Sequence, residues 1–213
     1  MILCSLHPLL FRGLKTISDL TDVQRTVRKA IQGNVAVISM HTNMDNAQGG
    51  VNFRIAQKLG LKDVRFLAST GSATAVGEYV SGQGTMAGQG AVAELVEALP
   101  AEAFIQKVKQ TFGVECAMCN ELLHRPIQKV AICGGAGDFL LDEAVKAGAD
   151  AFITGEMHYH QYFGYEQQIQ ICVIGHYQSE QFTAELFRDI IERECPGVQT
   201  YIAETNTNPI LCL

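Results

Sequence analysis

The chain has 213 residues, of which 47% are hydrophobic and 18% are charged, and its formal net charge is −6. This composition excludes a disordered chain, and the acidic balance argues against binding to nucleic-acid phosphates. No apolar run is long enough to span a membrane, and the seven scattered cysteines are typical of reduced thiols, so we expect a cytoplasmic protein.

The first third of the chain alternates between apolar runs and amphipathic stretches. Residues 1–6 and 35–40 predict buried strands. One helix is expected from a cap at residues 21–22 to Gly33, and another from residue 49 to residue 59. This alternation favours an α/β fold with a mostly parallel sheet.

The middle of the chain is predicted to be irregular at first and then to return to regular elements. Residues 64–68 and 75–80 read as short strands of a hairpin, followed by a glycine-rich loop over 81–90. Helices are then expected over 91–99 and 100–113, and strands over 114–119 and 127–133.

The last third again alternates. Its expected elements are a turn at 134–138 (GGAGD), a helix over 141–148, strands over 151–153 and 169–174, a long helix after 176, and a final strand over 198–203. The two alternating stretches suggest two similar α/β halves, over residues 1–69 and 127–213, with a connecting region over 70–126. A single intertwined domain is the alternative.

Metal-binding residue types gather where predicted strands end, which is where open α/β sheets place their ligand sites. They are His7, His41 with Asp45, Glu156 with His158 and His160, and His176 with Glu180. Of the six histidines, only His124 lies elsewhere. Mixed imidazole and carboxylate ligands suit Zn, Mn or Fe at a site with open coordination positions.

The stretch GHYQSE at residues 175–180 carries the sharpest part of this pattern. His176 and Glu180 are four residues apart at the start of a predicted helix, so their side chains share one side of it. An imidazole beside a carboxylate can bind a metal or transfer protons. A buried histidine beside a helix-capping acid is the alternative interpretation.

For three further motifs, a structural role is favoured over a functional one. The pair Cys116 and Cys119 has metal-like or redox-like spacing but lacks a second pair. The GGAGD turn could cradle an anion, although a tight turn with Asp138 as a helix cap explains it better. Ser179 is read as a helix cap rather than a nucleophile.

Taken together, these segments resemble the dinuclear-metal-centre hexameric proteins, also called NIF-three-like proteins or GTP cyclohydrolase I type 2 homologues. The resemblance is carried by LHPLLF (6–11), HTNMD (41–45), GGVN (49–52), LGL (59–61), GGAGD (134–138), GADAFITGE (148–156) and GHYQSE (175–180). It implies two similar α/β halves with mixed sheets facing a central metal cleft, and a homohexamer.

The resemblance also implies a ligand set for one or two divalent ions per chain: His7, Asp45, His176 and Glu180. The family pattern has a pair of adjacent histidines before a proline, and this chain has Leu6, which cannot ligate a metal, in place of the first. Either one metal binds weakly, or water or a neighbour such as His41 substitutes, or only one metal is held. Family members usually carry several dozen residues before this point, so the first half is expected to be incomplete at its N-terminus.

The expected function is that of a metal-dependent hydrolase acting on a small, nucleotide-like substrate. Glu180, His160 and Glu156 are the candidate catalytic residues, the latter two as supporting or proton-transfer groups. A non-catalytic metal-bound scaffold, a transcription-related regulator and an inactive copy are the alternatives. No membrane partner is expected, and nucleic acid is disfavoured.

Overall fold

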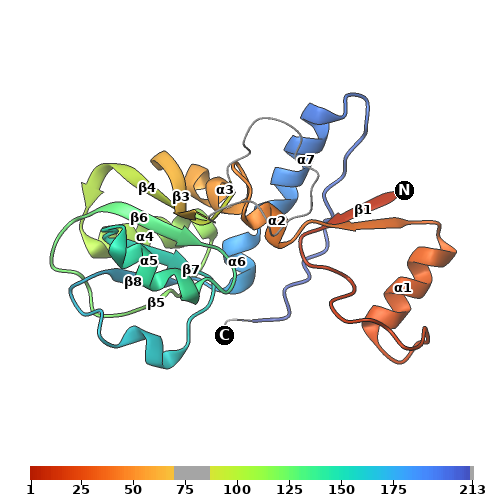
Figure 1. The fold of residues 1–213 in the computed structure, drawn as a ribbon, viewed down its shortest axis with the longest axis horizontal. Helices are drawn as coiled ribbons and strands as arrows, with labels where there is room; N and C mark the ends of the chain where they lie inside the picture. The colour runs from red at the N-terminus through yellow and green to blue at the C-terminus, as the bar shows by residue number, and fades with distance from the viewer. Residues whose placement is uncertain (70–86, 212–213) are drawn as a thin grey trace.

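The computed structural model describes residues 1–69 and 87–211. A six-stranded mixed sheet in the order β3-β4-β6-β7-β8-β5 forms its larger part, and a parallel pair, β1-β2, lies to one side (Figure 1). The strands are β1 (Ile2–Ser5), β2 (Ala36–Ser39), β3 (Lys62–Ser69), β4 (Gly88–Leu99), β5 (Met118–Cys119), β6 (Ile127–Cys133), β7 (Ala151–Thr154) and β8 (Gln170–Val173). The helices are α1 (Asp22–Gln32), α2 (Thr42–Asp45), α3 (Val51–Lys58), α4 (Ala101–Phe112), α5 (Leu141–Lys146), α6 (His176–Glu180) and α7 (Thr183–Glu194), with 3-10 turns η1 (Asp138–Leu140) and η2 (Tyr159–Tyr162).

The predicted α/β class is confirmed, and the large sheet is mixed. Its central strands β6, β7 and β8 are parallel, whereas β3, β4 and β5 join by antiparallel pairing. Because β6, β7 and β8 run in one direction, the loops that follow them meet at one edge of the sheet. Strand β3, which lies within the first predicted half (residues 1–69), pairs into this large sheet. The division of the chain into two halves with boundaries at residues 69 and 126 stays a prediction.

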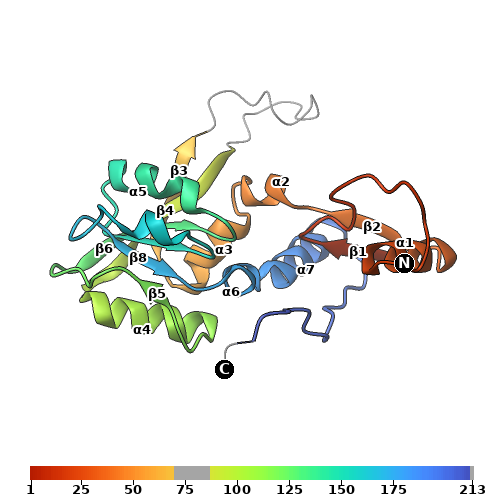
Figure 2. The same cartoon turned by 90° about the horizontal axis from the view of Figure 1, so that it is seen from below.

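The core covers both faces of the large sheet. Side chains that alternate along β6, β7 and β8 pack on one face against α3, α4 and α7, and on the other face against α5. Figure 2 shows α4 and α5 on opposite sides of the strands. Fully buried side chains such as Phe104 and Phe152 belong to the two faces respectively. This packing fixes the strand ends that carry the site.

The small sheet is much less enclosed. Its helix α1 begins at Thr21, whose hydroxyl accepts a hydrogen bond from the Gln24 amide, and ends at Gly33, as predicted. None of the α1 residues is buried. Met1 and the first two residues of β1, Ile2 and Leu3, are exposed, so the prediction of a buried strand over residues 1–6 is wrong. The pair β1-β2 therefore has little core of its own.

The predicted helix over residues 91–99 is wrong, because this stretch lies within β4. Alanine, glutamate and leucine favour helix in isolation, but here the strand is enclosed between β3 and β6. Ala91, Val92 and Ala93 are all buried. Gly88 also lets the two strands approach closely, since a Cβ there would lie 2.5 Å from the Phe66 ring. Tertiary pairing therefore overrides local propensity.

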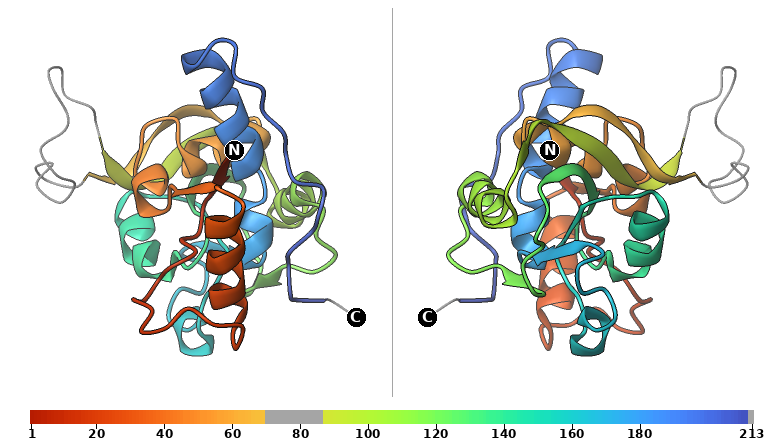
Figure 3. Two further views of the ribbon diagram at one scale, coloured as in Figure 1. Left: turned by 90° about the vertical axis from the view of Figure 1, so that its right-hand side faces the viewer. Right: turned by 90° about the vertical axis from the view of Figure 1, so that its left-hand side faces the viewer.

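Three other predictions are corrected in the described part of the chain. The strand expected over 114–119 is reduced to β5, and residues 198–203 form no strand but run irregularly along the outside of the molecule (Figure 3). The long helix after residue 176 is divided into α6 and α7. The strand expected over 75–80 and most of the glycine-rich loop lie outside the described residues. No helix among residues 1–69 and 87–211 is long and apolar enough to cross a membrane.

The register between β6 and β7 is held by the carboxylate of Asp150. One oxygen accepts the backbone N–H groups of Gln128 and Lys129, each at 2.9 Å, and the other accepts from Arg125. Burial acts to raise the pKa of Asp150, but these donors outweigh it and the pKa is lowered. The ionised carboxylate therefore stabilises the folded state.

Replacing Asp150 by alanine is expected to lower the free energy of unfolding by about 1–3 kcal/mol, because two amides of the sheet lose their acceptor. Since the folded pKa lies below the unfolded one, this stabilisation is complete above an unfolded pKa of about 3.9 and is lost as the pH falls through the folded value. Urea denaturation at several pH values measures the difference. The exposed pair Glu143–Lys146 provides a control, and an equally large loss in Glu143→Ala would contradict the assignment.

Candidate metal centre

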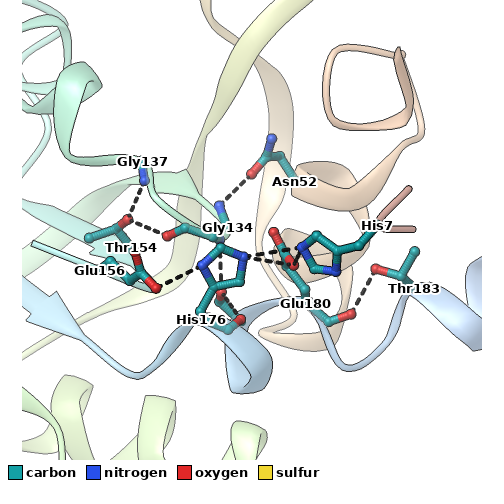
Figure 4. A network of polar contacts seen from close by, with 11 residues as sticks. His7, Asn52, Gly134, Gly137, Thr154, Glu156, His176, Glu180 and Thr183 are labelled. Atoms are coloured by element: carbon teal, nitrogen blue, oxygen red, sulfur yellow. Dashed lines mark hydrogen bonds and ion pairs between the residues drawn. The ribbon is translucent and has the colours of Figure 1, made fainter. Parts of the chain in front are cut away.

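The segment after β1 and the helix α6 bring imidazole and carboxylate groups together (Figure 4). His7 follows β1, where the small sheet ends. His176 and Glu180 are the first and last residues of α6, which begins directly after β8 and Gly175. His7 and His176 therefore face one another, although they are 169 positions apart in the sequence and follow strands of different sheets.

The three side chains form a nearly equilateral triangle of potential ligand atoms. The Nε2 atoms of His7 and His176 are 3.4 Å apart, and Glu180 Oε2 lies 3.4 Å from the first and 3.3 Å from the second. Ligands at about 2.0–2.1 Å from a tetrahedral ion are separated by about 3.3 Å. The group thus has the spacing that a tetrahedral metal requires of three of its ligands.

Glu180 supplies the strongest indication that a cation belongs here. Its side chain is only 9% exposed, and its Oε2 is buried without a hydrogen-bond partner among the described residues. A buried carboxylate oxygen that has no donor is costly, and such oxygens are rare in native proteins. The donor set of two imidazoles and one carboxylate matches catalytic zinc sites and leaves one position open.

The ring of His176 is oriented from behind by Glu156. Its Nδ1 lies 2.9 Å from Glu156 Oε1, so the carboxylate accepts the Nδ1 proton and Nε2 faces the centre of the triangle. Carboxylates commonly fix metal-binding histidines in this way. Glu180 first, and then Glu156, raise the pKa of His176 to about 9, against the opposing effect of burial.

Asp45 lies at the end of α2 and adds a second carboxylate to the same region. Burial, followed by the negative charge of Glu180, raises the pKa of Asp45 to about 6. The His41 ring, one turn before Asp45, lies 5.1 Å from the His7 ring. Asp45 and His41 stand outside the compact triangle but border it.

Two other predicted residues are placed differently. His160 lies on η2, is exposed, and packs edge-on against Tyr159, so it is not part of the triangle. His158 lines a cavity described below. Leu6, which occupies a ligand position of the resembled family, packs against the main core together with Met44. Its role here is apolar packing.

The GGAGD turn is the scaffold of the site rather than an anion cradle. Gly134 donates its N–H to Asn52 Oδ1, Gly135 to Ser179 Oγ, and Gly137 to Thr154 Oγ1. These amides are therefore already satisfied. The predicted cap at Asp138 is wrong, since its side chain makes no capping hydrogen bond and it is the first residue of η1.

Ser179 is also neither a helix cap nor an exposed nucleophile. Its hydroxyl is buried, donates to the His176 carbonyl at 2.7 Å and accepts from Gly135. It thereby ties α6 to the turn after β6. The roles of Ser179, Asn52 and Thr154 were missed because a single polar side chain in a sequence carries no periodic signal.

Gly135 packs directly behind the candidate ligands. A Cβ at this position would lie 2.4 Å from Glu180 Oε1 and 3.3 Å from His176 Nε2, and the backbone φ is +65°. Only glycine meets both conditions without displacing a neighbour. The turn therefore sets where the Glu180 carboxylate can lie.

A cavity of about 280 Å³ adjoins the site through Glu156. Its other lining residues are Ala136, Asp138, Met157 and His158. This volume lies at the lower limit of pockets that bind small molecules, which begin at about 300 Å³. Cys133 also lies near the carboxylates, but burial first, and then the charges of Asp45 and Glu180, raise the pKa of its thiol to about 12, so it stays protonated. A thiolate ligand is not expected there.

Comparison with known proteins finds relatives in sequence and in structure that carry related names. The chain is 29% identical over 210 residues to a protein named GTP cyclohydrolase 1 type 2 homolog from Lactococcus lactis, covering 95% of this chain and 74% of the relative. It is 32% identical over 175 residues to the protein of the same name from Clostridium perfringens, covering 82% of this chain and 63% of the relative.

A crystal structure of a Bacillus cereus protein related to NIF3 superposes on all of this chain, and on 83% of its own, with a TM-score of 0.83 at 21% identity. That likeness establishes the shared fold. The family model described as Duf34/NIF3 (NGG1p interacting factor 3) matches residues 1–209. With this match over nearly its whole length, the chain belongs to the Duf34/NIF3 family.

Proposed function

We propose that this protein binds a divalent metal ion between His7, His176 and Glu180. The observation that carries the proposal is the buried Glu180 Oε2, which lacks a hydrogen-bond donor and lies within 3.4 Å of two imidazole nitrogens. The ligand types favour Zn, Mn or Fe. The family membership supports the same reading, because the resemblance carried by the HTNMD and GHYQSE segments implies these ligands.

A second metal position, next to Asp45, is part of the same proposal. Asp45 and Glu180 repel each other, as the raised pKa of Asp45 indicates, and a second cation would relieve this repulsion. Since Leu6 packs into the core, the imidazole of His41 is the available neutral ligand on that side. Two ions are expected if His41 ligates, and one if it does not.

We further propose that the site hydrolyses a small, nucleotide-like substrate held in the adjoining cavity. A divalent ion supplies a water of lowered pKa and a positive charge that stabilises a developing oxyanion. Glu156 keeps the Nδ1 proton on His176, and Glu180 is the buried carboxylate beside the reacting position. For His160 to transfer a proton in this reaction, η2 would have to move it toward the triangle of His7, His176 and Glu180.

A metal-bound scaffold is the second candidate function. Exposed apolar side chains are numerous on the small sheet and its connections, including Met1, Ile2, Phe11 and Leu20. Such surfaces favour contacts with other copies or with partner proteins. The predicted homohexamer is proposed on this basis. The chain spans 74% and 63% of the two bacterial relatives, so the activity of the whole protein is a proposal throughout.

The metal content of purified protein tests the proposal. After loading with Zn, Mn or Fe and removal of free ions, elemental analysis is expected to find one or two equivalents in the wild type. His176→Ala should reduce this to background, and His41→Ala should reduce two equivalents to one. His124→Ala is the matched control, because His124 is exposed and lies outside the site.

Equal metal in the wild type and His176→Ala would overturn the site. For the hydrolase, a turnover screen over nucleotides and phosphoesters is run with loaded and metal-free protein. Activity that requires metal supports the enzyme, whereas full metal occupancy without turnover of any substrate supports the scaffold. A wild type that binds no metal would overturn the metal-binding proposal and would favour the inactive copy.

A further inference from the structure

Two cysteines face each other across the edge of the large sheet. Strand β5 lies antiparallel to β8, and Cys119 is directly opposite Cys172 in their register. Directly opposed residues of antiparallel strands have Cα atoms about 4.5–5.5 Å apart, inside the range of about 4.4–6.8 Å that disulfides span. The two thiols lie close enough for each to shift the pKa of the other. Both side chains pack on the same face of the sheet.

This arrangement changes the meaning of the CAMC segment at residues 116–119. Cys116 is exposed and precedes β5, whereas Cys119 is half-buried and lies within the strand. The second cysteine of the motif is therefore paired across the sheet rather than along the chain. Cys133, on β6, belongs to the opposite face of the sheet.

We propose that Cys119 and Cys172 form a dithiol site that is reversibly oxidised to a disulfide by exchange with a small disulfide such as that of glutathione. The site takes a low-molecular-weight disulfide as its co-reactant. It is independent of the metal proposal, because neither cysteine belongs to the triangle of His7, His176 and Glu180.

The exchange proceeds in two steps. The Cys119 thiolate attacks one sulfur of the small disulfide, forming a mixed disulfide and releasing one small thiolate. Cys172 then loses its proton and attacks Cys119 Sγ, forming the protein disulfide and releasing the second small thiolate. The protein loses two electrons and two protons, and the small disulfide is reduced to two thiols.

The environment assigns the order of attack. Cys119 is the more accessible sulfur, because Cys172 is fully buried. The Cys172 thiol lowers the pKa of Cys119 against the effect of burial, with a further contribution from Lys109. The Cys119 thiol, together with burial, raises the pKa of Cys172. The first nucleophile is therefore Cys119, and Cys172 resolves the mixed disulfide.

The test uses the full chain, equilibrated in glutathione buffers of increasing oxidised fraction and quenched with a thiol-alkylating reagent. Intact mass and non-reducing peptide mapping are expected to show that two of the seven thiols are lost to an intramolecular disulfide between Cys119 and Cys172. Cys172→Ala should instead stop at one stable glutathionyl adduct on Cys119, and Cys119→Ser should form neither product.

Cys116→Ser and Cys195→Ser are the matched controls, since both residues are exposed, and both variants should form the 119–172 link like the wild type. A link between residues 116 and 119, a persistent glutathionyl adduct on Cys119 in the wild type, or free thiols on both Cys119 and Cys172 at the most oxidising ratio would each overturn the proposal. If Cys172→Ala does not fold, the mapped link in the wild type and its loss in Cys119→Ser decide the question.

Discussion

Glu180→Gln is expected to abolish metal binding while leaving the fold intact. The amide keeps the size of the side chain but removes the charge that would neutralise a cation. At a metal concentration of 100 times the dissociation constant, the wild type should gain about 2.7 kcal/mol of stability and the variant none. Thermal unfolding with and without metal, together with elemental analysis, measures both effects.

The metal-free forms test the charge of Glu180 apart from metal binding. Without a cation, Glu180 repels Asp45 but also attracts the protonated ring of His176, whose pKa it raises to about 9. Replacing it by a neutral amide removes both interactions, and the loss of the attraction should leave the metal-free variant less stable than the metal-free wild type at neutral pH. Glu185→Gln, which alters a surface pair with Lys58, is the control and should leave metal binding unchanged. A Glu180→Gln variant with full metal content would remove Glu180 from the ligand set.

Gly135→Ala is expected to cause a loss of metal affinity that is much larger than its loss of stability. The added Cβ would lie 2.4 Å from Glu180 Oε1, the mobile end of a long side chain. The carboxylate can move away, but it then leaves the triangle. The positive φ alone costs about 1–2 kcal/mol for a residue with a Cβ.

Gly113→Ala separates the two effects. Gly113 has a φ of +62°, close to the +65° of Gly135, and a Cβ there would meet nothing within 4 Å. Both variants should therefore lose similar stability in metal-free denaturation. Isothermal titration with metal should show normal binding in Gly113→Ala and little or none in Gly135→Ala. Equal affinities in the two variants would show that the turn does not position Glu180.

The elements that were predicted correctly are those whose local pattern and tertiary environment agree. Residues 130–133 of β6 are all apolar because this part of the strand is covered on both faces. Helix α4 carries Phe104, Val108 and Phe112 on one side and ends at Gly113. β4 was missed because its helix-forming residues are enclosed between two strands, and no window of a single segment contains that information. Residues 198–203 have strand-forming side chains but no neighbouring strand among the described residues.

The candidate site divides in a similar way. His176 and Glu180 could be predicted as a pair from their spacing, because both lie on one helix and residues four apart share one side of it. Their proximity to His7 depends on how the small sheet meets the large one; the strand ends made His7 a candidate, and the family resemblance implied that it shares a ligand set with His176 and Glu180. Glu156 was a candidate from its place after β7, and the structure places it against His176. The partnership of Cys119 with Cys172 depends on strand register and could not be read from the spacing of the CAMC segment.

The weakly enclosed small sheet has a consequence for how the molecule comes apart. His7 lies at its end, whereas His176 and Glu180 lie on a helix that follows the large sheet. With no buried residue in α1, the small sheet should open at a lower free energy than the large core. An ion shared by the three residues would cross-link the two parts, and opening would then require its release. Metal occupancy would thus convert unfolding in two stages into a single cooperative transition.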